Sequence, residues 1–125
     1  MSAIRYAKSH VWLSIEGDVA TLGISPYAQE QLGDVVYVEL PKPGHALAAG
    51  TEAAVVESVK TASEIELPVA GTVIEANAAL EATPALVNED PLGKGWLFKL
   101  RLADPNEAAA LLDQAAYDAW VAELG

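Results

Sequence analysis

The chain has 125 residues, 52% of them hydrophobic, and its 18 acidic and 7 basic side chains give a formal net charge of −11. This length and composition predict one compact domain with a real core, and the acidic excess disfavours binding to nucleic acid or to an anionic membrane surface. The chain contains no cysteine, which excludes disulfides, thiolate metal ligands and a cysteine nucleophile, so redox chemistry would require a cofactor.

The first third of the chain predicts a hairpin, a short helix and a strand. Residues 11–24 contain two strand-like runs around Gly17, a residue that takes a positive φ at low cost. Ser25-Pro26 is typical of a helix N-terminus, and Gly33 can end the short helix that follows. Residues 34–40 are the densest β-branched and aromatic run, and they predict a strand that ends at the next two prolines.

Lys60 lies between two further strand-like runs. Residues 52–56 are apolar and β-compatible, and residues 63–67 alternate polar and apolar side chains before a Pro-Val-Ala-Gly break. The simplest interpretation is a strand, a tight turn that carries Lys60, and a second strand. Exposed lysines in hairpins are ordinary solvated residues, so position alone assigns no function to Lys60.

The second half of the chain predicts two more strands separated by an irregular segment. Residues 72–76 follow Gly71 as a short strand. Residues 77–95 are rich in alanine, proline, glycine and acid, with a helical turn expected within 80–86. Residues 96–102 alternate cleanly and predict a strand that closes the sheet, with one face formed by Trp96, Phe98, Leu100 and Leu102.

The C-terminal segment predicts helices. Asp104, Pro105 and Glu107 resemble a capping box, and Asp113 is placed to cap a second helix. Apolar residues recur in this segment at helical spacing and are expected to pack on the sheet: Leu111, Leu112, Ala115, Ala116, Ala119 and Trp120.

Many short strands without alternating full-length helices indicate a mainly β fold. We expect an antiparallel sandwich or flattened barrel with a short internal helix and a C-terminal helical tail. The expected organisation is a single domain over residues 1–125, with its core at about 10–103 and the helical segment at about 104–124.

The residue types that commonly carry catalysis or bind metals lack their usual spacing. His10 and His45 are far apart with no cysteine nearby, so no metal site is predicted. No Gly-x-Ser-x-Gly elbow marks a nucleophile, and Gly93-Lys94-Gly95 precedes a strand instead of the helix of a phosphate loop. No apolar run is long enough to span a bilayer and the first residues do not resemble a signal peptide. We therefore expect a cytoplasmic protein without catalytic residues, although a transit peptide removed earlier would leave no trace.

Ordered blocks along nearly the whole chain resemble the H-protein family of the glycine cleavage system. The hairpin is similar at Glu57-Ser58-Val59-Lys60, Ile65 and residues 68–73. The other similar blocks are Ser9-His10, Trp12, 17–21, Gly23-Ile24, 27–29, 32–34, 38–41, 86–91, 95–99, Tyr117 and Trp120. The resemblance implies a lipoyl-domain-like barrel-sandwich hybrid with lipoic acid joined by an amide bond to Lys60. It also implies that a lipoate-attaching enzyme recognises the neighbouring hairpin residues Glu57, Ser58, Val59 and Thr61.

The same resemblance implies a carrier in glycine catabolism and one-carbon metabolism. A pyridoxal-phosphate glycine decarboxylase would load an aminomethyl group on the arm, and a tetrahydrofolate-dependent aminomethyltransferase would remove it. Dihydrolipoyl dehydrogenase would then reoxidise the arm. The loaded arm is expected to fold back on the protein surface, away from water. The acidic surface is expected to provide solubility or to steer the protein toward basic faces of these partners.

Two positions depart from the family pattern. Val11 stands where the family usually has glutamate, and Glu64 stands where aspartate is common. If those acids hold the charged amine of a loaded arm, Glu64 or a neighbouring carboxylate is expected to do so here. Three other roles stay open: relay of lipoyl groups to other proteins, service as a lipoyl domain of a 2-oxo acid dehydrogenase, and an unmodified interaction module. Biotin attachment is disfavoured because methionines do not flank Lys60.

Overall fold

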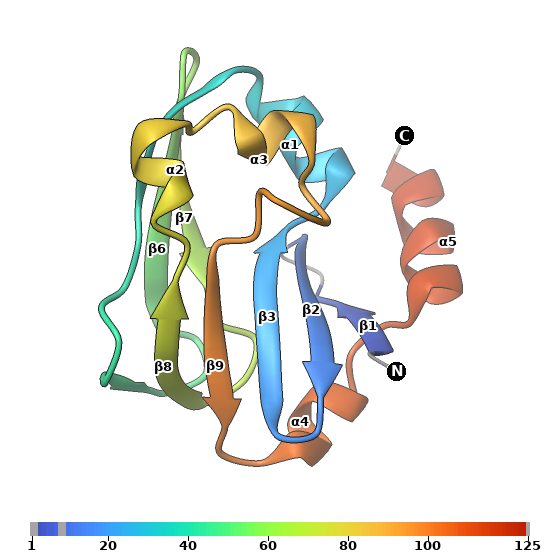
Figure 1. Cartoon of the computed structure of the whole chain (residues 1–125). Coiled ribbons are helices and arrows are strands. Elements are labelled where there is room, and N and C mark those ends of the chain that lie inside the picture. Colours follow the sequence, from blue (N-terminus) through green and yellow to red (C-terminus); the bar gives the residue numbers. More distant parts are fainter. Residues whose placement is uncertain (1–2, 8–9, 125) are drawn as a thin grey trace.

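Two antiparallel sheets form the body of the protein in the computed structural model, which describes residues 3–7 and 10–124 (Figure 1). Ser9 lies outside the described residues. The larger sheet has the strand order β1 (Ala3–Tyr6), β2 (Val11–Glu16), β3 (Val19–Ile24), β9 (Phe98–Leu102), β8 (Gly71–Ala76), β5 (Ala46–Leu47). The smaller sheet has the order β4 (Val35–Glu39), β6 (Glu52–Ser58), β7 (Ala62–Glu66).

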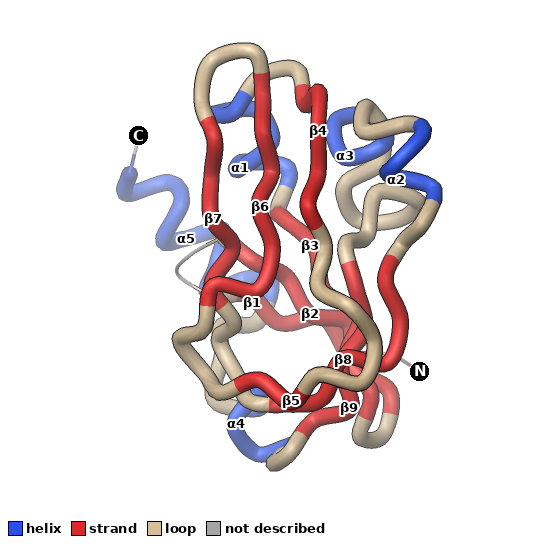
Figure 2. Tube along the Cα trace, turned by 90° about the vertical axis from the view of Figure 1, so that its left-hand side faces the viewer, coloured by secondary structure: helices blue, strands red, loops and turns tan. Residues whose placement is uncertain are grey.

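The predicted antiparallel, mainly β architecture is confirmed, as a sandwich of two separate sheets and not as a closed barrel. Both sheets contribute to one apolar core. Leu22 and Leu100 of the larger sheet and Val56 of the smaller one are all 0% exposed. Burial of this apolar surface is the main source of stability, and it leaves the β6–β7 hairpin projecting at one end of the molecule (Figures 1 and 2).

The helix α1 (Pro26–Leu32) follows the predicted capping pattern. Ser25 is the N-cap, and its Oγ accepts a hydrogen bond of 3.1 Å from the Ala28 N–H. Gly33 ends the helix with a φ of 83°, which an L side chain rarely adopts. The sequence signals for this helix are therefore confirmed at both ends.

The segment between β8 and β9 differs from expectation. It holds two short helices, α2 (Ala79–Ala82) and α3 (Leu86–Glu89), in place of one helical turn within 80–86. Pro84 lies between them, where its missing N–H prevents a continuous helix. The side chain of Asn77 closes this excursion by donating to the carbonyls of Lys94 and Trp96 at 2.9 and 2.7 Å.

The predicted strand over 96–102 begins only at Phe98. Phe98, Leu100 and Leu102 share the buried face as expected, but Leu97 is also fully buried and Trp96 is only half-buried. Strict alternation fails at Leu97 because this residue belongs to the same core cluster as Leu80 and Val87 of the excursion, so apolar side chains cover it.

The C-terminal helices α4 (Pro105–Ala109) and α5 (Gln114–Leu124) form where predicted. Asp104 and Asp113 both cap, accepting from the backbone N–H groups of Asn106 and Ala116 at 3.0 and 2.8 Å. The reciprocal half of the capping box is absent, because the Glu107 carboxylate accepts instead from the Ala70 N–H at 3.5 Å.

The predicted packing face of α5 was partly wrong. Ala115, Ala116 and Ala119 are exposed, whereas Tyr117 is 3% exposed and packs with Tyr6 and Trp12 in a second cluster. The tyrosine ring buries more apolar surface than an alanine, so it determines which face of α5 turns toward β1 (Figure 1). Among the described residues, no helix has both the length and the apolar character required to cross a membrane.

Candidate functional site

The turn that carries Lys60 is held by Ser58. The Ser58 N–H donates to the Thr61 carbonyl at 2.8 Å, and the Ser58 hydroxyl donates to the same carbonyl at 3.1 Å. The Ser58 Oγ also accepts from the backbone N–H groups of Lys60 and Thr61, both at 3.2 Å. These bonds fix the backbone of the predicted turn, while Lys60 itself is exposed.

The residues next to Lys60 differ in their solvent exposure. Val59 is 67% exposed, and its N–H donates to the Asp34 carbonyl at 3.0 Å. Glu57 is half-buried opposite Tyr37 of β4, and Thr61 is exposed. The hairpin tip therefore presents an apolar side chain and an amine on a backbone that β4 supports.

A groove with a volume of about 390 Å³ lies beside this hairpin. Its walls come from His10, the end of β3, α1, the Lys60 turn and β7. The lining residues are His10, Ile24, Tyr27, Ala28, Gln31, Leu32, Thr61, Ser63, Glu64 and Ile65. Of the predicted site residues, Thr61 and Glu64 line the groove, and Glu57, Ser58, Val59 and Lys60 do not. Val11 is 1% exposed within the core.

His10 forms one wall of the groove. The sequence patterns pointed to this residue only as a possible metal ligand and as part of a family motif, and they did not predict its place beside the hairpin. Its φ is 68°, and its ring lies 4.8 and 4.9 Å from the rings of Tyr27 and Trp120. Its Nδ1 lies 2.8 Å from the Tyr117 hydroxyl. Burial lowers the pKa of His10 from its ordinary value of 6.5 and raises the pKa of Tyr117 above 10.0, so both groups are favoured in their neutral forms.

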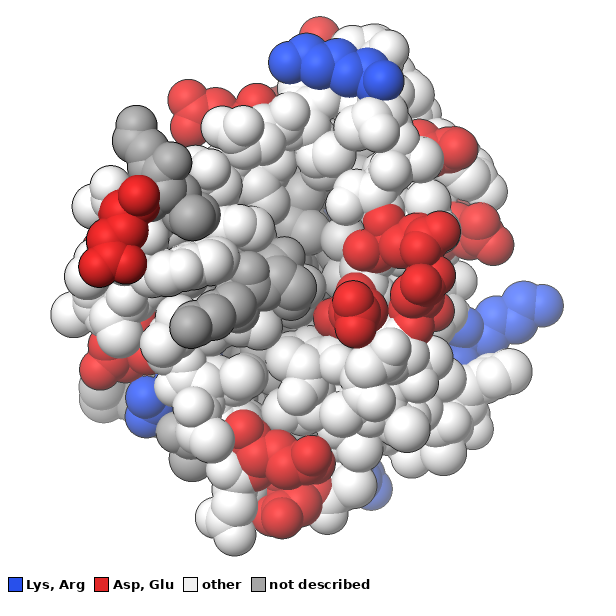
Figure 3. Space-filling model, turned by 180° about the vertical axis from the view of Figure 1, so that it is seen from behind, with Lys and Arg blue, Asp and Glu red and all other residues white. Residues whose placement is uncertain are grey.

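Glu64 is the acidic residue that lines the groove, and it lies close to a second carboxyl. Hydrogen bonding and repulsion between the carboxyls of Glu52 on β6 and Glu64 on β7 raise the pKa of Glu52 above its ordinary 4.5. Acidic side chains gather in several clusters on the face seen in Figure 3, with basic side chains toward its margins. A cation that approaches this face therefore meets a favourable potential.

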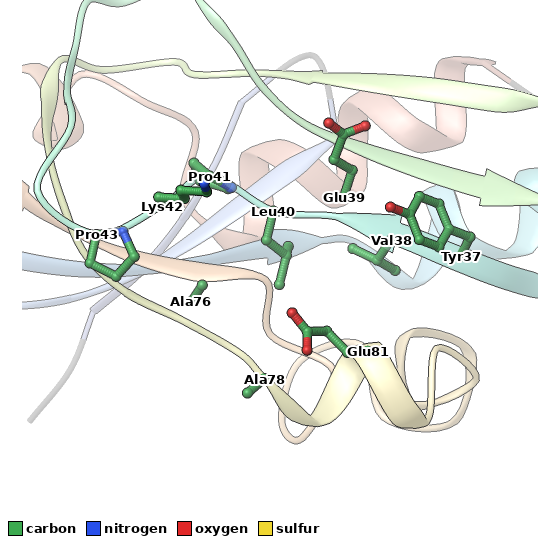
Figure 4. Close-up of a pocket in the computed structure, with 10 residues that line it drawn as sticks. All are labelled: Tyr37, Val38, Glu39, Leu40, Pro41, Lys42, Pro43, Ala76, Ala78 and Glu81. Atoms are coloured by element: carbon green, nitrogen blue, oxygen red, sulfur yellow. The ribbon is translucent and has the colours of Figure 1, made fainter.

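A larger hollow of about 490 Å³ lies away from Lys60, between β4 with its following loop and α2 (Figure 4). Leu40 and Glu81 point into it from opposite sides. None of the predicted site residues lines it. Nor do three His, Cys, Asp or Glu side chains of the described ranges come together as metal ligands. The smaller groove is therefore the one of the two that borders the hairpin.

An antiparallel sandwich that presents a lysine on a braced hairpin beside a groove defines a carrier-type domain. Residues 4–124 match the family described as "Glycine cleavage H-protein". The chain is 59% identical over 124 residues to the glycine cleavage system H protein of Parvibaculum lavamentivorans, covering 99% of each chain. It is 57% identical over 122 residues to that of Bradyrhizobium diazoefficiens, covering 98% of this chain and all of the relative.

The fold comparison agrees with the sequence comparison. The crystal structure of a glycine cleavage system H protein from Mycobacterium marinum matches with a TM-score of 0.87 and 33% identity, covering 96% of this chain and 97% of that one. The chain belongs to the glycine cleavage H-protein family. It is thus a lipoyl carrier component of the glycine cleavage system, which works with the other components of that system, and not an enzyme.

Proposed function

We propose that Lys60 is the residue to which lipoic acid is attached through an amide bond. The observation that carries this proposal is the position of Lys60 on a turn fixed by Ser58, next to Thr61, which lines a groove. An exposed amine on a rigid turn can enter the active site of an attaching enzyme with little loss of conformational freedom. The exposed Val59 and Thr61, the half-buried Glu57 and the turn residue Ser58 form the surface that this enzyme would read.

The groove fits an arm of mixed character. Ile24, Leu32 and Ile65 give it apolar walls, and Glu64 places a carboxylate in its lining. Lipoic acid supplies a disulfide that accepts electrons and a cargo group together. Val11 stands where the family usually has glutamate, and its apolar side chain is buried in the core, so it cannot bind a charged group. Glu64 therefore holds the positively charged amine of the cargo.

The carrier moves the aminomethyl group of glycine from glycine decarboxylase to the tetrahydrofolate-dependent aminomethyltransferase, and dihydrolipoyl dehydrogenase reoxidises it. Residues 1–125 act as one carrier domain in the cytoplasm, in keeping with the bacterial relatives. The acidic face steers it toward basic surfaces of these partners, which predicts association rates that fall as salt rises.

Intact-mass measurement of protein from cells that lipoylate their proteins tests the attachment. We expect one lipoyl-sized increment in the wild type and in Lys94→Arg, a matched change at another exposed lysine, and none in Lys60→Arg. A wild-type chain that never carries the increment would refute the proposal and leave the unmodified interaction module.

Exchange of labelled carbon dioxide into glycine by glycine decarboxylase tests the partner. The lipoylated chain is expected to support this exchange and not to serve a 2-oxo acid dehydrogenase. Acceptance only by the latter enzyme would overturn the assignment. Transfer of the lipoyl group to other proteins, measured with the same sample, would establish the relay role.

A further inference from the structure

Two hydroxyl groups connect the groove wall at His10 to the C-terminal helix. The Tyr117 hydroxyl of α5 lies 2.8 Å from His10 Nδ1 and 2.7 Å from Ser25 Oγ. The Ser25 Oγ also accepts from the Ala28 N–H at the start of α1. Tyr117 and Ser25 are both buried, so these groups must satisfy one another.

The number of hydroxyl hydrogens determines which group donates and which accepts in the hydrogen bonds that join Ser25, Tyr117 and His10. If Ser25 donates to Tyr117 and Tyr117 donates to His10 Nδ1, every hydroxyl hydrogen has an acceptor. In the opposite direction, the Ser25 hydrogen has no acceptor among the hydrogen bonds of the described residues. A buried hydroxyl hydrogen without an acceptor is costly, so the first direction is favoured. His10 Nδ1 is then an acceptor, and a neutral ring carries its proton on Nε2.

The backbone and the neighbouring rings restrict how His10 can turn. Its N–H donates to the Ala7 carbonyl and its carbonyl accepts from the Ser25 N–H, both at 2.9 Å, which hold the residue at its φ of 68°. Tyr27 and Trp120 flank the ring, and Tyr117 meets its edge. Because Nδ1 is occupied, Nε2 is the ring nitrogen available to a group that enters the groove.

We propose that Tyr117 is a positioning residue that holds neutral His10 as the Nε2–H tautomer and so makes this wall of the groove a hydrogen-bond donor. This inference rests on the proposed function for the identity of the occupant. The donor fits an acceptor atom of the attached arm, either its amide carbonyl oxygen or a sulfur, while Glu64 of β7 fits the ammonium of the cargo. The groove thereby offers a hydrogen-bond donor to the arm and a carboxylate to the ammonium of the cargo, so that the two groups bind at different places.

Nitrogen-15 NMR of the unmodified chain tests the tautomer without any attached group. We expect the His10 signals of the Nε2–H form in the wild type, and a shift toward a mixture of tautomers in Tyr117→Phe. Tyr6→Phe is the matched control, because Tyr6 stacks on Tyr117 at 4.2 Å and its hydroxyl binds Gln114 of α5 instead of His10. An Nδ1–H form in the wild type would overturn the proposal, and so would equal effects of the two variants.

Two modified forms identify the acceptor. An octanoyl arm on Lys60 has the amide carbonyl without sulfur, whereas a lipoyl arm loaded with its cargo has both. A change of the His10 Nε2 signal with octanoyl assigns the carbonyl, and a change only with the loaded lipoyl arm assigns sulfur. No change with either form would overturn the acceptor assignment.

Hydrolysis of the loaded arm in the absence of partner enzymes, in which water releases ammonia and formaldehyde and leaves a free thiol on the arm, gives a second measurement through the ammonia. His10→Asn, in which asparagine tolerates the positive φ, is expected to release it about tenfold faster than the wild type, the factor for one lost hydrogen bond. Tyr117→Phe is expected to release it faster than the wild type by a smaller factor, because part of its His10 population keeps the Nε2–H donor. Tyr6→Phe should match the wild type, and rates for Tyr117→Phe equal to those of Tyr6→Phe would refute the proposal. If Lys60 is never lipoylated, the proposed function fails while the tautomer result still stands.

Discussion

The side chain of Lys60 crosses directly over Gly33. A Cβ placed on Gly33 would stand 3.2 Å from Lys60 Cε and 3.7 Å from its Nζ. The residue that ends α1 is therefore also part of the surface on which the hairpin lysine rests. This dual role leads to a prediction about a glycine that does not lie in the hairpin.

Gly33→Ala is expected to lower the free energy of unfolding by about 2–3 kcal/mol, because alanine is strained at a φ of 83°, and to displace the Lys60 side chain. Gly17→Ala is the matched control, since Gly17 also has a positive φ, 62°, but no atom within 4 Å of an added Cβ. Only the Gly33 variant should change the rate of lipoylation. Equal lipoylation rates in both variants would show that the contact with Lys60 does not matter.

Ser58→Ala removes the hydroxyl that three hydrogen bonds within the turn use. Because these bonds are exposed, the expected loss of stability is only about 1 kcal/mol. The rate of lipoylation should fall by a larger factor, since the turn loses its fixed shape. Ser58→Thr retains the hydroxyl and is expected to restore the rate. Failure of threonine to do better than alanine would assign the effect to size and not to hydrogen bonding.

The raised pKa of Glu52 predicts a dependence of stability on pH. A carboxyl whose pKa is higher in the folded chain binds its proton more tightly there, so its contribution weakens as pH rises above about 4.5. Glu52→Gln should therefore gain stability relative to the wild type between pH 4 and pH 7, and added salt should reduce this gain. Glu16→Gln, an exposed change on β2, serves as the control in the same titration. A difference that does not vary with pH would contradict the interaction between the Glu52 and Glu64 carboxyls.

Asn88 of α3 connects three parts of the structure. Its Oδ1 accepts from the Val35 N–H at 2.8 Å, and its Nδ2 donates to the Gly33 carbonyl and to Gln29 Oε1 at 2.8 and 3.0 Å. Asn88→Ala is expected to lower the free energy of unfolding by about 2–4 kcal/mol. Asn106→Ala, at an exposed position of α4, should have little effect in the same denaturant titration. A small loss for Asn88→Ala would show that water replaces these bonds.

Local signals predicted most of the strands and the first helix because their causes lie within a few residues, but they did not predict β1 or β5. Ser25, Pro26 and Gly33 act within one helix, and the turn at Lys60 is closed by Ser58. The pairing of His10 with Tyr117 could not be predicted in this way, because 107 positions separate them. The orientation of α5 failed for the same reason: its own periodicity favoured alanines, whereas the cluster around Tyr6 and Trp12 selected Tyr117.

The site was predicted to the extent that a family motif carried it. The motif singled out Lys60 and Glu64, and the structure places Glu64 in the lining of the groove and Lys60 on the turn next to Thr61, which also lines it. The groove itself forms only where α1, β3, β7 and His10 come together, and no local sequence pattern predicts that arrangement. Even so, the His10 and Tyr117 blocks of the resemblance marked two residues whose contact becomes apparent only in three dimensions.

The three bonds of Asn88 also bear on how small a lipoyl acceptor tag could be made from this protein. The excursion between β8 and β9 is the most irregular segment and looks like the natural place to shorten the chain. Yet Asn88 holds Gly33 and Val35, and the intervening Asp34 carbonyl accepts from the Val59 N–H at the hairpin tip. A minimal tag must therefore retain this excursion, and trimming is better directed at the loop between β4 and β5.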